Sequence, residues 1–479
     1  MESLSDTKWD VVISGTGLQQ SLLALALSRS EKNILHVDHN DFYGESEAAL
    51  SLHEADVWAQ RHAAHGEGIF SAAEVTKDDA GLSFSRAYSL ALAPQLIHAR
   101  SDLLSQLVSS KAFRQVEFLA VGSFFIYQDE ALSRIPSTRE DVFVNTTISA
   151  RSKRALMKFL KFVLEYDSEP QVMVWKAKAS EPLVDFLLSD FKLDRDLRSY
   201  VVALTLSLDE RIPVEAGLAA IKRHLTSMGV FGPGFAAVYP KWGGISEIAQ
   251  VGCRAGAVGG AVYMLGTGVS GVETAEDELE IKLTNDLAVR TKTLVQGASK
   301  PMKQSPSVSR LTAVVASDFS SLFETTIEGS PTPCVAVVAF PSESVVDSNG
   351  TSNSPIYALV HSSDTGECPA GQCTIYLSTV STPRSKDMLD AALSCLLATS
   401  PEPVGCLYKL RYDQKGGTGS FTVDGGCGTF GLPPLDLAFN DSALASVREA
   451  WDMVVPNGEG DYMQFNDREG AFDEDAVGD

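Results

Sequence analysis

The pattern of hydrophobic positions at the start of the chain predicts a strand, a helix and a second strand in close succession. The run WDVVIS, from Trp9 to Ser14, is apolar and β-branched, and the glycine turn GTG follows it at once. The segment LQQSLLALALSRS then repeats its apolar residues at helical spacing, and NILHVDHN returns to a strand pattern. Residues 9–43 are therefore predicted to form a βαβ unit that opens a parallel sheet.

The turn inside this unit resembles a dinucleotide-binding fingerprint with one contact spoiled. In such a fingerprint Gly15 would allow the tight turn, Gly17 would let backbone N–H groups approach a pyrophosphate, and Asp38 would bond a ribose hydroxyl. The third glycine of the motif is replaced by Gln20, whose side chain stands where helix and strand should pack closely. The pattern favours a βαβ scaffold with no bound nucleotide.

The pattern changes twice along the rest of the chain. Residues 54–82 look polar and irregular, whereas VEFLAVGSFFIYQ alternates like a strand. From Ser137 to Met228 amphipathic helical spacing predominates, and strand signals return afterwards, ending in GGAVYML. In this last region Ser246 is the expected cap of a helix that carries Glu247 in its first turn. We expect a large sheet-containing domain from residues 1–136 and 229–445, a helical insertion at 137–228, and a C-terminal helix with an acidic tail at 446–479.

Charge and cysteine content narrow the classes of function. The formal net charge of −23 argues against a nucleic-acid-binding surface. The acidic excess is strongest in GEGDYMQFNDREGAFDEDAVGD, a segment we expect to be solvated. The seven cysteines are odd in number and dispersed, which fits reduced thiols. No apolar run approaches a membrane span and the first residues do not resemble a signal peptide, so we expect a cytoplasmic protein.

Catalytic chemistry finds little support in the sequence. We find no nucleophile with an adjacent base, and the eight histidines are dispersed without metal-ligand spacing. We therefore expect no catalytic residues and no metal site.

Four ordered blocks together resemble the superfamily of Rab escort proteins and Rab GDP-dissociation inhibitors. The blocks are WDVVISGTGL with LHVDHNDFYGE, then YSLALAPQLIHARSDLLSQLVSS, RIPSTREDVF with KRALMKFLKFV, and YPKWGGISEIAQVGCRAGAVGGAVYML. The resemblance implies a mixed α/β (α+β) fold, similar to FAD/NAD(P)-binding folds, with a large sheet domain and a smaller all-helical insertion. It also implies that no flavin or other cofactor is bound, which agrees with Gln20, and that the insertion holds the geranylgeranyl lipid of a Rab GTPase.

The same resemblance suggests which residues bind the partners. The Rab-binding platform of the family corresponds here to Tyr43 from FYG, Glu247 and Arg254 from SEIAQVGCR, and Tyr263 with Met264 from GGAVYML. The family often has an Arg-Tyr-Gly stretch before the fourth block, where this chain has MGVFGPGF, so the contacts of that arginine are not transferred. A contact with the prenyltransferase belongs to the insertion, where the candidate exposed aromatic residues are Phe186, Phe191 and Tyr200, each of which could equally serve core packing.

The C-terminal region separates the branches of the superfamily. LPPLDLAFNDSALASVREAWDMVV followed by DYMQFNDREG is similar to the ending of fungal-type escort proteins. The resemblance thus implies a non-catalytic escort that binds GDP-bound, unprenylated Rab, presents its C-terminal cysteines to the Rab geranylgeranyltransferase α/β heterodimer, and delivers the product during transient membrane association. A Rab GDP-dissociation inhibitor and an FAD-dependent oxidoreductase are the alternatives.

Overall fold

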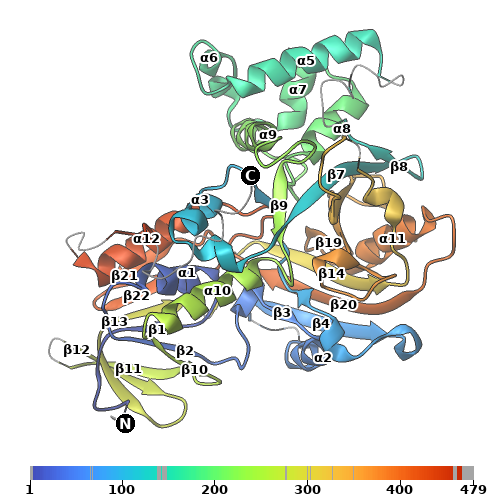
Figure 1. Cartoon of the computed structure of the whole chain (residues 1–479). Helices are drawn as coiled ribbons and strands as arrows, with labels where there is room; N and C mark the ends of the chain where they lie inside the picture. Colours follow the sequence, from blue (N-terminus) through green and yellow to red (C-terminus); the bar gives the residue numbers. More distant parts are fainter. Residues whose placement is uncertain are drawn as a thin grey trace, which may run out of the picture.

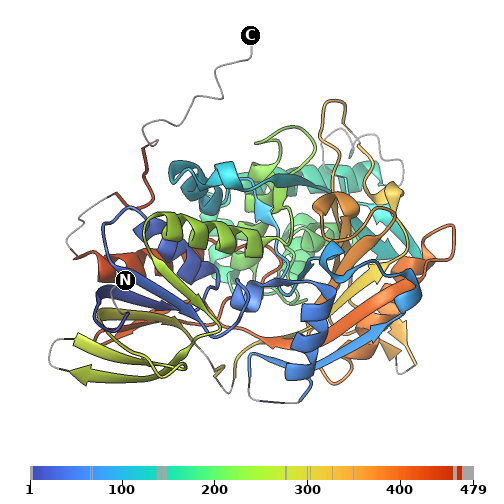
Figure 2. The same cartoon turned by 60° about the horizontal axis from the view of Figure 1, so that its bottom comes forward.

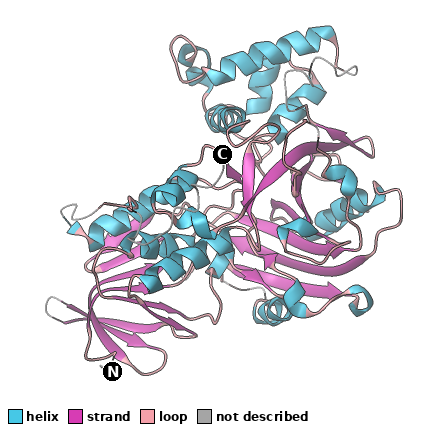
Figure 3. Cartoon of the chain, viewed as in Figure 1, coloured by secondary structure: helices cyan, strands magenta, loops and turns pink. Residues whose placement is uncertain are grey.

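The structure is a computed structural model that describes residues 4–64, 66, 68–136, 142, 148–275, 278–298, 300–302, 304–325, 327–348, 350–456 and 461–466. Two large sheets lie side by side, and a group of helices stands apart at one end (Figures 1 and 3). This is the mixed α/β architecture that the sequence predicts. The acidic tail lies mostly outside the described residues.

The first sheet has the order β10-β2-β1-β13-β12-β11, with β22 joined to β13 and β21 to β22. Strands β10, β2, β1, β13 and β22 run parallel, which places their carboxyl ends at one edge of the sheet. The bounds are β1 Lys8–Ser14, β2 Ile34–Asp38, β10 Val262–Leu265, β11 Val269–Ala275, β12 Glu278–Leu283, β13 Ala288–Gly297, β21 Phe421–Asp424 and β22 Cys427–Phe430.

Strand β1 is apolar on both sides, and helices cover one face of this sheet. Val11 and Ile13 join the core under α1 Leu18–Leu27, α10 Ile245–Val258 and α12 Ser442–Val454, whereas Val12 packs on the opposite face. Every residue of α1 is buried. Figure 2 shows α10 and α1 lying across the strands of this sheet.

The second sheet has the order β4-β20-β14-β19-β18-β15-β7-β9-β6, and β8 pairs with β7. Its central strands are buried on both faces, between α11 Ser385–Ala398 on one side and elements of the N-terminal half on the other. The bounds are β4 Phe70–Lys77, β6 Ile97–His98, β7 Phe118–Gln128, β8 Ala131–Arg134, β9 Ala237–Pro240, β14 Ser307–Val315, β15 Val335–Phe340, β18 Ile356–Ser362, β19 Cys373–Val380 and β20 Cys406–Lys415. Two small ribbons pair β3 Ala49–Leu50 with β5 Leu90–Ala91 and β16 Val346–Asp347 with β17 Gly350–Thr351.

The helices at the end of the molecule form a group with its own core, which we call the helical unit. Its core contains Phe159, Phe186 and Leu218, all fully buried. The unit comprises α5 Ala150–Leu164, α6 Val172–Trp175, α7 Leu183–Phe191, α8 Arg195–Ala203 and α9 Val214–Ser227. All five helices fall within residues 137–228.

Residues 54–82 correct one expectation from the sequence. They are not irregular, because α2 Leu52–Arg61 and β4 occupy most of the segment. Helix α2 begins with a complete capping box, in which the Ser51 hydroxyl accepts from the Glu54 N–H and the Glu54 carboxylate accepts from the Ser51 N–H. Two further short elements are α3 Asp102–Ser109 and the 3₁₀ turn η1 Glu45–Glu47, of which η1 contributes to the candidate site.

Candidate functional site

The turn between β1 and α1 has the geometry of a dinucleotide-binding turn. Gly15 has φ +98°, a left-handed conformation that a residue with a Cβ rarely adopts. Its carbonyl lies 2.6 Å from Nε2 of the buried His36 on β2. Gly17 is the N-cap of α1 and has no side chain of its own with which to cap the helix, so the first N–H groups of α1 need another partner.

Two carboxylates from η1 supply that partner. The N–H of Gly17 donates to Glu45, and the N–H of Leu18 donates to Glu47. Gln20, in place of the third glycine, donates its Nε2 to Glu45 Oε2 at 3.1 Å. The chain thus places its own anions at the helix N-terminus, where a bound pyrophosphate would otherwise lie.

Burial and crowding raise the pKa of both carboxyl groups. Burial raises the pKa of Glu45 well above its ordinary value, and the nearby Asp38 and Glu47 raise it further. Burial also raises the pKa of Glu47, to about 7. The site therefore holds two neighbouring acids whose protonated forms are favoured by burial.

Asp38, the expected ribose ligand, already has all its hydrogen bonds. Its Oδ2 accepts from the Thr16 N–H at 2.8 Å and from Thr16 Oγ1 at 2.6 Å. Its Oδ1 accepts from the Asn40 N–H at 2.8 Å and from Asn40 Nδ2 at 3.1 Å. A carboxylate offers about four lone-pair positions, so none remains for a ribose hydroxyl.

These residues do not fit a flavin dinucleotide. A Cβ added to Gly15 would stand 2.4 Å from Glu45 Oε1, so the carboxylate occupies the space directly over the turn. A cleft of about 780 Å³ adjoins the turn and is lined by Gln20, Glu45 and Glu47 among others. A pyrophosphate entering there would meet two acids instead of free N–H groups.

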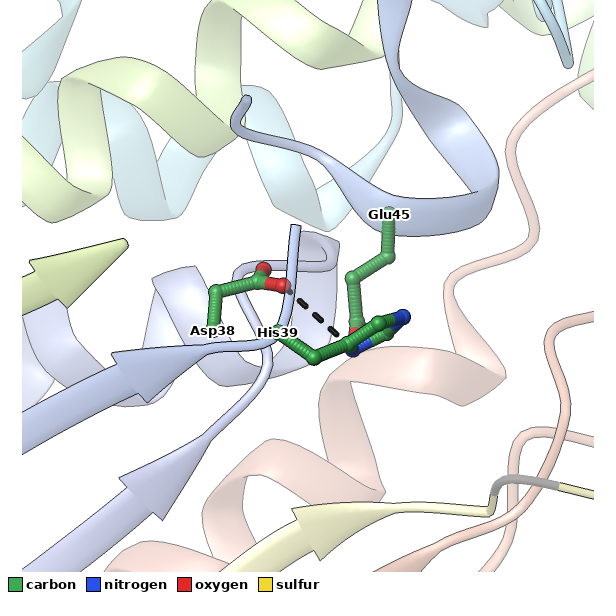
Figure 4. Close-up of side chains that lie close together, drawn as sticks. All are labelled: Asp38, His39 and Glu45. Carbon is green, nitrogen blue, oxygen red and sulfur yellow. Dashed lines mark ion pairs between the residues drawn. The ribbon is translucent and has the colours of Figure 1, made fainter. Parts of the chain in front are cut away.

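The same side chains bring together a cluster with the composition of a metal site. Ligand atoms of Asp38, His39 and Glu45 lie within 4.8 Å of one another, with His39 Nδ1 3.6 Å from Asp38 Oδ1 (Figure 4). The lone pairs of Asp38 are occupied by Thr16 and Asn40, and Glu45 accepts from Gly17 and Gln20. Metal binding would have to break these bonds, so the cluster serves to fix the turn.

Tyr43, Glu247 and Arg254 lie around one side of α10. Glu247 is in the first turn of α10 and Arg254 follows two turns later, so both occupy one helix face, and the charge of Arg254 opposes the rise in the pKa of Glu247 that burial causes. Arg254 is exposed and Tyr43 is half-buried. Burial and the nearby Cys253 raise the pKa of Tyr43, which places Tyr43 beside the middle of α10.

Tyr263 and Met264 alternate along β10 and so point to opposite faces of the sheet. The Tyr263 ring stacks on His36 at 4.8 Å between ring centroids, and its hydroxyl lies beneath Gly256 of α10. Burial raises the pKa of Tyr263. Met264 packs against the core on the other face. Only the edge of β10 therefore reaches the surface that carries Arg254.

Two of the three aromatic candidates of the helical unit are buried. Phe186 is 0% and Phe191 6% exposed, and their rings pack edge to face at 5.5 Å inside the core of the unit. Tyr200 is half-buried where this core meets the core of the second sheet. The helical pattern had already suggested core packing, and the structure places Phe186 and Phe191 there.

One exposed aromatic residue was not anticipated from the sequence. Trp242 is 52% exposed, has φ +75°, and lies in the turn between β9 and α10, with Lys241 over its ring. Its N–H donates to the Thr365 carbonyl, and its own carbonyl accepts from Ser89 Oγ. The adjoining glycines in PKWGG were a visible turn signal, but they did not reveal that the tryptophan would be exposed.

The fold and the blocked turn define a class of protein that retains the scaffold of a dinucleotide-binding enzyme while filling the cofactor position with its own side chains. The family model described as "GDP dissociation inhibitor" matches residues 5–396. The chain belongs to this GDP dissociation inhibitor family, in agreement with the resemblance seen in the sequence.

Relatives and solved structures agree with this assignment. The chain is 31% identical over 400 residues to "Rab proteins geranylgeranyltransferase component A" of Saccharomyces cerevisiae, covering 81% of this chain and 64% of that protein. It is 30% identical to the protein of the same name from Candida albicans, covering 80% of this chain and 60% of the relative. The chain thus spans less than two thirds of the length of either relative.

The fold is also found in solved structures. A Rab GDI from Plasmodium falciparum matches with a TM-score of 0.66 at 20% identity, covering 93% of this chain and 98% of that one. An oxidoreductase from Methanosarcina mazei matches with a TM-score of 0.59 at 14% identity, covering 93% and 100%. At these identities the likeness concerns the fold alone. It links the family fold to that of oxidoreductases, as the sequence predicted.

Proposed function

We propose that this chain is a Rab escort protein, the accessory component of Rab geranylgeranyltransferase. The observation that carries the proposal is the pair of carboxylates, Glu45 and Glu47, at the N-terminus of α1, because they leave the cofactor position of an oxidoreductase fold unsuited to a dinucleotide. The similarity to the component A proteins of two yeasts supports an escort.

In this proposal the surface around Tyr43, Glu247 and Arg254 binds a Rab GTPase in its GDP form. Tyrosine offers rigid amphipathic area and arginine a planar set of donors, and both are frequent in the energetic centres of interfaces. The position of Glu247 and Arg254 on one face of α10 supports this role. Tyr263 contributes by supporting α10 from below, and Met264 contributes through packing on the opposite face.

The chain makes and breaks no bond itself. It holds the cysteine-bearing tail of an unmodified Rab within reach of the catalytic α/β heterodimer, and then keeps the geranylgeranylated product soluble. Burying one methylene is worth about 0.8 kcal/mol, so a twenty-carbon chain exposed to water costs on the order of 10 kcal/mol. The helical unit shelters this lipid and contacts the transferase. The protein works in the cytoplasm and visits membranes transiently.

A GDP-dissociation inhibitor is the second candidate because the matching family model carries that description, whereas the similarity to the two yeast component A proteins favours the escort. Reconstituted prenylation separates the two. With the purified heterodimer, geranylgeranyl diphosphate and an unmodified GDP-bound Rab, an escort supports lipid transfer, whereas an inhibitor only extracts Rab that already carries lipid. Absence of transfer together with efficient extraction would replace the escort by the inhibitor.

Measurement of the affinity for GDP-bound Rab tests the Rab-binding surface. Arg254→Ala should weaken binding of GDP-bound Rab by about tenfold or more, the loss expected for a residue at the centre of an interface. Its Tm should not change because the side chain is exposed. Arg290→Ala, which removes an exposed arginine from β13 instead of α10, is the matched control. An equal loss of affinity in both variants, or a fall in Tm for Arg254→Ala, would remove Arg254 from the interface.

A further inference from the structure

The outer face of α5 carries a line of positive charge. Arg151, Arg154, Lys158 and Lys161 are all exposed and follow one another at spacings of three, four and three residues, which puts them on one face of the helix. We call these residues the α5 stripe. From Arg151 to Lys161 it extends about 15 Å along the helix axis.

The stripe stands out against an acidic molecule. Residues 137–228 contain 14 lysines and arginines against 13 aspartates and glutamates, whereas the whole chain has 39 against 62. The net charge of −23 therefore lies outside the helical unit. Helix α5 itself, Ala150–Leu164, contains no acidic residue.

Only Lys161, in the last turn of α5, suits the dipole of the helix that carries the stripe. Like charges three or four residues apart repel each other, and a cation such as Arg151 in the first turn opposes the helix dipole. Among the residues that the structure describes, no side chain forms an ion pair with these four residues; Lys158 contacts the Phe191 ring, with Nζ 5.7 Å from the ring centroid. The fold provides no reason for this arrangement, which points to a ligand outside the chain.

Exposed apolar side chains lie just beyond the end of α5. Leu164 is 46% exposed, and Met173 and Val174 on the following α6 are 74% and 43% exposed. Of the acids in the connecting turn, Asp167 is paired with Lys222 at 2.7 Å, while Glu165 and Glu169 are exposed. A basic helix face with neighbouring exposed apolar residues is typical of a surface that binds anionic membranes.

The position of α5 in the molecule agrees with such a surface. Helices α5 and α6 lie at the far end of the helical unit, away from β11, β12 and β13 (Figure 1). An anionic bilayer would attract this end and repel the acidic remainder, so the charge distribution fixes the orientation of the molecule.

We propose that the α5 stripe, assisted by Met173 and Val174, docks the protein on an anionic lipid surface. This inference rests on the proposed delivery of prenylated Rab to membranes and identifies the face that meets the bilayer. It brings the helical unit, which is proposed to shelter the lipid, next to the membrane that receives the lipid.

Vesicle co-sedimentation of the full chain without Rab tests the proposal. Binding to vesicles of phosphatidylcholine with phosphatidylserine is expected, with little binding to phosphatidylcholine alone and a decrease as salt is added. R154Q/K158Q should weaken binding by about 30-fold, because each cation near an anionic surface accounts for about a fivefold change. R290Q/K292Q, which removes the same charge from exposed positions on β13, should bind as the unchanged chain does.

Equal binding of R154Q/K158Q and the unchanged chain, or binding that does not depend on phosphatidylserine, would overturn the proposal. The proposal would also fail if R154Q/K158Q bound vesicles normally but no longer bound the transferase heterodimer, since the stripe would then be a contact with a protein. Affinity for GDP-bound Rab should be the same in R154Q/K158Q and the unchanged chain. A failure of Rab binding in every variant would instead contradict the proposed function.

Discussion

At the scale of single residues, two glutamates determine whether the turn between β1 and α1 can bind a dinucleotide. Glu45 and Glu47 accept hydrogen bonds from the first N–H groups of α1, so the helix N-terminus is satisfied from within the chain. This arrangement costs stability because two acids share a partly buried space with Asp38 nearby.

The pKa of Glu47 gives this arrangement a measurable signature. The group has an ordinary pKa of 4.5 and a pKa of about 7 in the folded chain, so the folded state binds more protons between these values. The free energy of unfolding should therefore decrease as pH rises from 4.5 to about 7. Glu47→Gln keeps an acceptor without a charge and should raise stability at pH above 7 by on the order of 1 kcal/mol, after allowance for partial exposure.

Urea titrations of both proteins across this pH range measure the effect. The difference in stability between Glu47→Gln and the unchanged chain should be small at low pH and reach its full size above pH 7. A constant difference at all pH values would mean that the Glu47 carboxyl does not titrate with a raised pKa.

The sequence allowed part of this site to be predicted. Gly15, Gly17 and Asp38 were singled out because they belong to one local unit with known spacing, and the structure places Gln20 in a hydrogen bond to Glu45 beside the same turn. Glu45 and Glu47 were missed because their role depends on η1 folding back over α1, and no local pattern reveals that contact. The alternation of Tyr263 and Met264 was readable, but only the position of α10 shows that Tyr263 is covered.

At the scale of elements, α1 and α10 approach each other through glycine. A Cβ on Gly252 would lie 2.5 Å from the backbone oxygen of Ser21, and a Cβ on Gly259 would lie 2.1 Å from that of Ser28. The backbone of α1 cannot yield as a flexible side chain would. The close contact between these helices fixes the distance of α10 from α1. It thereby also fixes the position of Glu247 and Arg254 relative to Tyr43.

Gly252→Ala tests this packing. Alanine has the higher helix propensity and by itself would stabilise α10 by up to about 1 kcal/mol. The collision with Ser21 should reverse the sign and destabilise the protein by roughly 1 to 3 kcal/mol, measured as a fall in Tm. Ala257→Gly, at an exposed position of the same helix, is the control and should cost only the propensity difference. A rise in Tm for Gly252→Ala would show that the two helices can separate freely.

Predictions of helices and strands from the sequence were reliable where a hydrophobic pattern continued over a long segment. The βαβ unit and the strand VEFLAVGSFFIYQ, observed as β7, agree with the structure. Helix α2 was missed although the spacing of Ser51 and Glu54 was a readable capping box, because half of its sequence LHEADVWAQR is polar. The expected cap at Ser246 is wrong, since α10 begins at Ile245 with Gly244 as its cap. Consecutive glycines gave no way to choose between the two starts.

At the scale of the whole molecule, the helical unit joins the sheets through a buried pair of histidines. His98 on β6 and His224 on α9 have ring centroids 5.8 Å apart, and His224 also packs edge to face on Phe124 of β7. Neither ring nitrogen of His98 has a hydrogen-bond partner within the described part of the chain. Burial lowers the pKa of His98 well below its ordinary value and lowers the pKa of His224 to about 4. Protonation of either ring would place an uncompensated charge at the junction, beside Arg223.

This pair predicts that acid weakens the junction. The unfolded chain takes up protons at His224 below pH 6.5, whereas the folded chain does so only near pH 4, so the free energy of unfolding should fall over this interval. The contribution of His224 is on the order of 3 kcal/mol by pH 4. His224→Phe keeps the aromatic packing and removes the titration, so its stability should decline less than that of the unchanged chain between pH 6.5 and 4. Because Glu47 acts in the opposite direction, Glu47→Gln should make the acid decline steeper, and identical pH profiles for all three proteins would exclude both titrations.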